Sequence, residues 1–115
     1  MAKIEKAALL QGTLDMLILK SLLQGPRHGY DIVTWIQTVS HDVLGVEEGS
    51  LYPALHRMEQ REWIVAEWGK SKSNRRAKFY QLTRLGKAQL TREVHEWEQL
   101  VRGITLVLNA TPAEA

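Results

Sequence analysis

The sequence contains no cysteine among its 115 residues. This absence excludes disulfide bonds, zinc sites built on thiolates and cysteine nucleophiles. No apolar run approaches the roughly 18 residues that a membrane-spanning helix needs. The first residues also lack the apolar stretch and cleavage site of a secretory signal peptide. Together with an ordinary apolar fraction of 44%, these absences predict a small folded protein of the cytoplasm.

Catalytic patterns are scarce as well. The histidines are scattered, without the regular spacings of metal ligands. Ser50, His56 and Glu59 are residue types that hydrolases use, but Ser50 and His56 do not share a face of one helix. No glycines of a nucleophile elbow surround the serine. We therefore expect no enzyme, no catalytic residue, no metal site and no cofactor.

What the sequence does contain is a basic segment. Residues 70–92 include eight lysines and arginines and no acidic residue. Residues 1–69 hold six basic and nine acidic side chains, and residues 93–115 hold one basic and four acidic, so the net charge of +2 conceals this concentration. Like charges repel one another, which favours an anionic partner such as the phosphate backbone of nucleic acid. The alternative is a solvated surface loop.

Apolar residues at helical spacing predict three short helices in the first half of the chain. We expect them at about residues 14–24, 29–39 and 48–61. Thr13 is the expected N-cap of the first helix, and Gly25-Pro26 should end it. Between the second and third helices we expect a short strand at residues 43–46.

In the second half of the chain, the spacing of apolar residues changes from that of helices to that of strands. Two short strands are predicted at residues 63–68 and 78–82, joined by a polar, basic hairpin tip. Thr83 is the expected cap of a long final helix. Three helices followed by a basic hairpin indicate a winged helix-turn-helix, a mainly α fold with a small antiparallel β-hairpin. The expected divisions are a DNA-binding domain (1–82), a dimerisation helix (83–110) and a frayed tail (111–115).

In that fold the third helix enters the major groove of DNA, and the hairpin contacts the flanking backbone. Leu51, Leu55 and Met58 recur at helical spacing and should face inward. The expected residues that read or orient on the major groove are Ser50, Tyr52, His56 and Arg57. The expected phosphate-binding residues of the hairpin are Lys70, Lys72, Arg75, Arg76 and Lys78. The alternative for the third helix is an ordinary amphipathic surface helix.

The final helix carries apolar residues at alternating spacings of four and three, which is a heptad pattern. These seam residues are Leu90, Val94, Trp97, Val101, Ile104 and Leu108. The seam is too short for a stable free-standing coiled coil, so it needs a partner surface. We favour a second copy of the chain in a twofold dimer, because a small winged helix has little interior left for a long helix. The alternative partner is the first helix of the same domain.

Trp97 lies in the middle of this seam. It is either a core aromatic or one wall of an effector site at the dimer interface, where a flat molecule can stack. Glu93, Glu96 and Glu98 flank it, which favours a planar cation.

Three stretches of sequence resemble the PadR family of transcriptional regulators. They are HGY at His28–Tyr30, EGSLYPAL at Glu48–Leu55 and YQLTRLGK at Tyr80–Lys87, within a similarity that covers about residues 9–108. The resemblance implies a winged-helix dimer that binds operator DNA, usually as a repressor, with the last helix crossing to the partner subunit. Some members of the family release DNA when a small aromatic effector binds. The chain is similar to the short form, with a single C-terminal helix.

The function expected from the sequence is therefore a homodimeric repressor that binds an inverted-repeat operator and blocks polymerase sterically. Two alternatives remain. One is a scaffold that sequesters a small molecule at Trp97, and the other is a protein-interaction module that uses the last helix. Neither alternative requires specific DNA binding.

Overall fold

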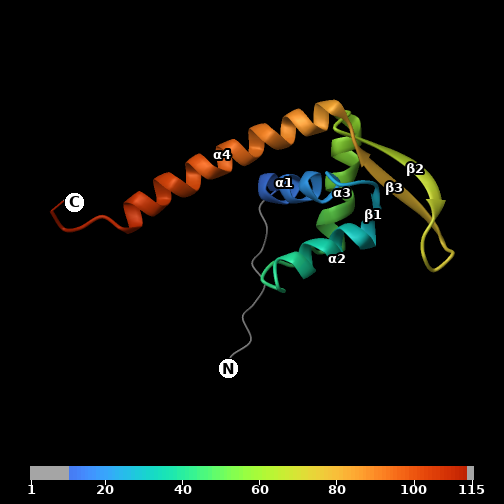
Figure 1. Ribbon diagram of the computed structural model, residues 1–115, viewed down its shortest axis with the longest axis horizontal. Coiled ribbons are helices and arrows are strands. Elements are labelled where there is room, and N and C mark those ends of the chain that lie inside the picture. The colour runs from blue at the N-terminus through green and yellow to red at the C-terminus, as the bar shows by residue number, and fades with distance from the viewer. Residues whose placement is uncertain (1–10, 114–115) are drawn as a thin grey trace, which may run out of the picture.

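The computed structural model describes residues 11–113, in which four helices accompany a three-stranded sheet (Figure 1). The elements are α1 (Gln11–Ser21), β1 (Arg27–His28), α2 (Gly29–Val39), α3 (Glu48–Gln60), β2 (Ile64–Lys70), β3 (Arg76–Leu82) and α4 (Arg84–Leu108). The first ten residues of the predicted DNA-binding domain and the last two of the predicted tail lie outside the described residues. The α+β fold class predicted from the sequence is confirmed.

One apolar core joins the first three helices to the sheet. Leu51, Leu55 and Met58 of α3 are almost fully buried, as their spacing predicts, and they pack among residues such as Ile18 and Ile32 of α1 and α2. Each such side chain contributes about 1.5–3 kcal/mol of stability through the apolar surface that it removes from water. The buried side of α3 therefore holds the helix in place, while its other side is left for contacts outside the domain.

The sheet has the order β1-β3-β2, and both pairings are antiparallel. β2 and β3 form the predicted hairpin, or wing, and each is longer than the alternation of apolar residues indicates. The two-residue strand β1 is not predicted from the sequence, because its pairing depends on the free edge of β3 and not on its own pattern. The strand predicted at residues 43–46 is wrong, since only an isolated β-bridge forms there, at Leu44.

The helix ends test two of the expected caps and show a third that was not expected. Thr13 is not an N-cap, because α1 already includes Gln11 and Thr13 lies inside the helix. Thr83 does cap α4, and its Oγ1 accepts a hydrogen bond from the backbone N–H of Gly86 at 3.0 Å. α2 is capped by a residue that the sequence does not indicate: Nδ1 of His28 accepts from the N–H of Asp31 at 3.2 Å.

The long helix α4 begins against the rest of the domain and then leaves it (Figure 1). At its start, Gly86 is so close to the carbonyl oxygen of Trp63 that a Cβ atom there would overlap it. Leu90 is buried in the common core and Val94 packs against it. From His95 to Ala113 every residue is exposed, so the second half of α4 extends away from its own domain.

Candidate nucleic-acid interface

The exposed side of α3 is polar and is bordered by α2. Ser50, Tyr52, His56 and Gln60 are all exposed. The Tyr52 ring packs over the start of α2, where a Cβ atom on Gly29 would lie 2.8 Å from the tyrosine hydroxyl. Glycine at position 29 thus lets α2 and α3 approach each other closely. Of the four predicted groove residues, Ser50, Tyr52 and His56 lie on this side.

Arg57, the fourth of them, is held from inside the domain. Its Nη2 donates to Oδ1 of Asp15 in α1 at 2.6 Å, and Asp15 is only 4% exposed. Burial raises the pKa of the Asp15 carboxyl, and the Arg57 guanidinium opposes that rise. Gln60, one helical turn after His56, is also exposed, as the helical period of α3 predicts.

The tip of the wing carries three basic side chains that we call the tip cations: Lys70, Lys72 and Arg75. None of them takes part in an ion pair within residues 11–113. The tip is ordered by Ser71, whose Oγ accepts from the N–H of Arg75 at 3.3 Å and lies 3.0 Å from Oγ of Ser73. Asn74 has a φ of 62°, a left-handed conformation that asparagine tolerates well. The hairpin therefore presents its charges from a defined turn.

The other two predicted phosphate-binding residues already have partners. The Arg76 guanidinium lies over the Trp68 ring, 4.4 Å from its centre, which fixes the side chain but leaves its charge unpaired. Nζ of Lys78 donates to Oε1 of Glu59 in α3 at 3.0 Å, and this hydrogen bond raises the pKa of Lys78. Lys78 thus connects the wing to α3, and its charge is balanced there.

A groove of about 870 Å³ separates the tip of the wing from the first half of α2. Its lining includes the tip cations together with His28, Tyr30, Thr34 and Ser73. Arg27 also lines it, but the Arg27 Nε donates to the Ser21 carbonyl at 2.7 Å and its Nη1 pairs with Asp31 at 3.3 Å. The available positive charge of the groove thus comes from the wing, with hydroxyl and ring donors opposite.

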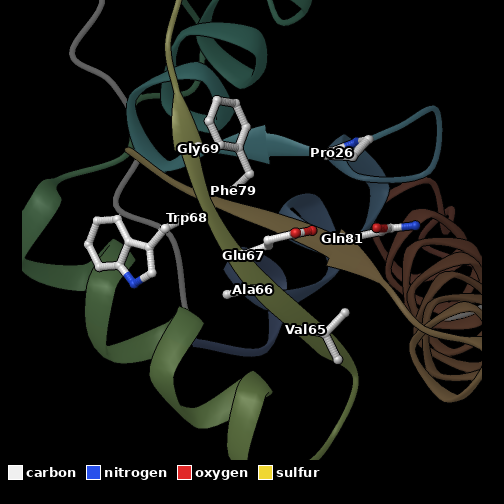
Figure 2. A pocket seen from close by; sticks show the side chains of 8 residues that line it. All are labelled: Pro26, Val65, Ala66, Glu67, Trp68, Gly69, Phe79 and Gln81. Atoms are coloured by element: carbon white, nitrogen blue, oxygen red, sulfur yellow. The ribbon is translucent and has the colours of Figure 1, made fainter. Parts of the chain in front are cut away.

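A second hollow, of about 430 Å³, lies on the outer face of the sheet (Figure 2). Figure 2 shows Glu67 and Gln81 side by side on this face, while Trp68 leaves the strand on the other side. Phe79 lies against Gly69, where a Cβ atom would be 3.2 Å from the ring. None of the residues that line this hollow is basic, so the hollow offers no side chain that would bind phosphate.

The predicted seam of α4 divides in two. Leu90 is buried and Val94 partly buried within the domain, but Trp97 is 43% exposed and Val101, Ile104 and Leu108 are exposed too. Leu100 and Val107, which the heptad pattern leaves out, are also exposed. They border a hollow of about 470 Å³ together with Gly103 and Ile104. Leu100 and Val107 lie at helical spacing from Ile104, and this spacing is the sequence signal by which both could have been found.

Comparison with known proteins places this geometry in a family. A sequence profile described as "Transcriptional regulator PadR-like family" matches residues 18–92. The chain belongs to the PadR-like family of transcriptional regulators. The match includes every candidate DNA-contacting residue but ends before Val94, so it includes only Leu90 of the seam.

Similarity to individual proteins covers most of the chain. An uncharacterized protein X from Lysinibacillus sphaericus is 32% identical over 103 residues, which cover 90% of this chain and 94% of that protein. A transcriptional regulator from Clostridium thermocellum superposes with a TM-score of 0.76 at 27% identity, covering 83% of this chain and 92% of that one. A PadR family transcription regulator from Clostridium difficile gives 0.70 at 30% identity, with 84% and 98% covered. The winged-helix fold predicted for this PadR regulator is confirmed.

Residues 11–113 of this PadR regulator contain neither a candidate membrane span nor a candidate metal site. No helix in this range is both long and apolar enough to cross a membrane. No group of three histidine, aspartate or glutamate side chains in the same range is arranged to hold a metal ion.

Proposed function

We propose that this PadR-family regulator binds a specific operator as a homodimer and represses transcription by blocking polymerase. The observation that carries the proposal is the placement of a polar, exposed α3 face beside a wing whose tip cations have no acidic partner among the described residues. A side chain without an internal partner is free to bind phosphate. The wing supplies affinity for the phosphate backbone, and α3 supplies the groups that read bases.

On α3, the groups available for base recognition have complementary chemistry. The Gln60 amide can form a bidentate pair with adenine, and His56 offers both a donor and an acceptor. Ser50 and Tyr52 carry hydroxyls near the start of α3, where the helix approaches DNA in this class of fold. We assign base recognition to Gln60 and not to Arg57, since Arg57 is bound to Asp15.

Backbone binding is assigned to the tip cations and Arg76. One DNA strand would run along the groove between the wing and α2, where Tyr30 and Thr34 add neutral donors. If three phosphates are neutralised by each of two copies, the slope of log K against log salt is roughly −5.

We propose that a second copy of the chain pairs with the first through the outer half of α4. Its apolar residues are exposed over several helical turns, and exposed apolar patches of this kind mark association surfaces. Residues 83–110 would thus form a dimerisation helix attached to the winged-helix domain. Pairing two such helices about a twofold axis would place two α3 helices about 34 Å apart, which matches an inverted repeat.

Selection from random duplex DNA tests the operator. The full-length protein is incubated with a random library, and bound fragments are sequenced over several rounds. We expect an enriched inverted repeat with half-sites separated by about one helical turn. Recovery of no enriched sequence would contradict specific recognition, and recovery of a single half-site would contradict the dimer.

A second candidate function is response to a small effector at Trp97. The ring is half exposed on the outer half of α4, and Glu96 and Glu98 beside it are exposed as well. A planar cation can stack on such a ring, and it would release DNA by favouring a dimer whose α3 spacing no longer fits. Quenching of Trp97 fluorescence by flat cations, together with weaker operator binding, supports this function. Absence of both effects across a broad panel refutes it.

The remaining alternatives are a ligand-sequestering scaffold and a protein-interaction module. Replacing Arg75 and Arg76 with alanine separates these alternatives from the proposal, because only a DNA-binding protein has DNA affinity to lose.

For a regulator of this kind, the site of action is the cytoplasm.

A further inference from the structure

A partly buried polar cluster lies near the C-terminal end of α3, where α1 packs against both α3 and α4. Asp15 comes from α1, Arg57 from α3 and Glu93 from α4. Arg61, which follows the last residue of α3, is near enough to influence the pKa of both acids. The cluster therefore contains one charged side chain from each of the three helices.

Within this cluster, Arg57 and Asp15 form the tightest contact. Nη2 of Arg57 is 2.6 Å from Oδ1 of Asp15, and the Asp15 side chain is nearly inaccessible to solvent. Nε of Arg57 is also buried and has no hydrogen-bond partner within residues 11–113. If Arg57 moved out to reach a base, it would leave a buried carboxylate unpaired, which is strongly destabilising. The pair thus fixes Arg57 on the inner side of α3.

Glu93 lies on α4, which packs against α1, and is close enough to Asp15 for the two charges to interact. Its Oε1 accepts from Nε2 of Gln89 at 3.1 Å, while Oε2 is buried without a hydrogen-bond partner among the described residues. Burial raises the pKa of Glu93, and the nearby charges of Asp15 and Glu96 raise it further, whereas Gln89 and Arg61 oppose the rise. An unpaired acceptor on α4 and an unpaired donor on α3 thus belong to the same cluster.

We propose that Arg57 is a positioning residue, that Asp15 holds it, and that Glu93 makes this pair sensitive to the position of α4. The connection runs from α4 through this cluster to α3. Trp97 follows Glu93 by one helical turn, so a displacement at the outer half of α4 reaches Glu93 first. This inference rests on the proposed function, because it assumes that α3 reads DNA.

The first test is Asp15→Asn in the full-length protein, with binding measured to the selected operator and to random duplex DNA. Asparagine keeps an acceptor for Arg57, so the variant is expected to fold, which circular dichroism verifies. We expect operator affinity to fall at least tenfold, with random-DNA affinity and the salt slope unchanged. Asp15 is buried and touches no DNA, so a direct contact cannot explain such a loss.

Arg57→Met and the double variant complete the test. We expect Arg57→Met to lose as much operator affinity as Asp15→Asn, and the double variant to lose no more than either single one. If Asp15→Asn binds the operator like the wild type, the inference is overturned. It is also overturned if the loss in Arg57→Met is confined to one base pair of the operator, because that result indicates direct base contact.

Glu93→Gln tests the α4 end of the connection and serves if Asp15→Asn does not fold. Because the pKa of Glu93 is raised, we expect the operator affinity of the wild type to change as pH falls from neutral and Glu93 becomes protonated, and Glu93→Gln to remove at least half of that change. Glu98→Gln, the same substitution at an exposed position of α4, should leave it intact. Identical pH profiles for the wild type and Glu93→Gln would overturn the inference. Failure of the wild type to bind any DNA selectively would instead overturn the proposed function.

Discussion

The basic side chains of this protein differ in whether another residue already binds them. The tip cations have no acidic partner among the described residues, whereas Arg57 is bound to Asp15 and Lys78 to Glu59. These two groups look alike in the sequence, because both place positive charge on predicted DNA-contacting elements. The charge available to a polyanion is therefore the charge that the fold leaves unpaired. We call this the division between paired and unpaired cations.

The largest effect is expected from Arg57→Ala. Removing Arg57 leaves Asp15 buried without its partner, so we expect a loss of about 3 kcal/mol in the free energy of unfolding. Urea denaturation measures it. The control is Arg75→Ala, which removes an unpaired cation and should change stability by no more than about 0.5 kcal/mol. Equal stability of the two variants would contradict the division.

The next effect concerns DNA affinity. Replacing Lys72 and Arg75 together with alanine removes two unpaired cations from each wing. We expect affinity for any duplex to fall by about 100-fold at moderate salt, because counterion release is lost at four phosphates of a dimer. Fluorescence anisotropy with labelled operator and random DNA measures both losses. A loss limited to the operator would show that these residues read sequence instead of holding the backbone.

Glu93→Gln is expected to have a smaller, stabilising effect. Because the pKa of Glu93 is raised in the folded state, its contribution to stability is fully present below the unfolded-state pKa and is lost as pH rises through the folded-state value. Stability of the wild type should therefore increase as pH falls from neutral toward that range. The substitution should add about 1 kcal/mol at neutral pH and flatten this part of the profile. A destabilised Glu93→Gln protein at neutral pH would contradict this account.

The smallest effect is expected from Lys78→Ala. Its pair with Glu59 is partly exposed, and such pairs contribute about 0–1 kcal/mol to stability. Its charge is already balanced, so we expect less than a threefold loss of DNA affinity. The anisotropy assay compares it with Lys72→Ala, a lysine without a partner among the described residues. A larger loss for Lys78→Ala than for Lys72→Ala would reverse the division.

The sequence predicts the local features of this fold well. α2 and α3 lie close to the predicted ranges, and Thr83 caps α4, because helical period and capping chemistry are properties of neighbouring residues. The wing and its basic tip follow from the same kind of local pattern. The PadR motifs, which extend over most of the chain, supply the arrangement of these parts.

Features that depend on distant partners are not predictable in this way. The helical period places Arg57 away from the core, but its long side chain reaches Asp15, 42 positions earlier in the chain. β1 exists because β3 has a free edge, and no pattern within two residues can indicate that. Lys78 likewise pairs with Glu59 only because the wing folds back toward α3.

The role of the wing cations is tested by the salt dependence of operator binding by the full-length protein. If these cations bind phosphates, the slope of log K against log salt should be roughly −5. The Lys72→Ala and Arg75→Ala double variant, which removes two of the three phosphate contacts of each copy, should reduce it to roughly −2. A wild-type slope near zero, or an unchanged slope in the double variant, would contradict the claim that the unpaired cations of the wing bind the DNA backbone.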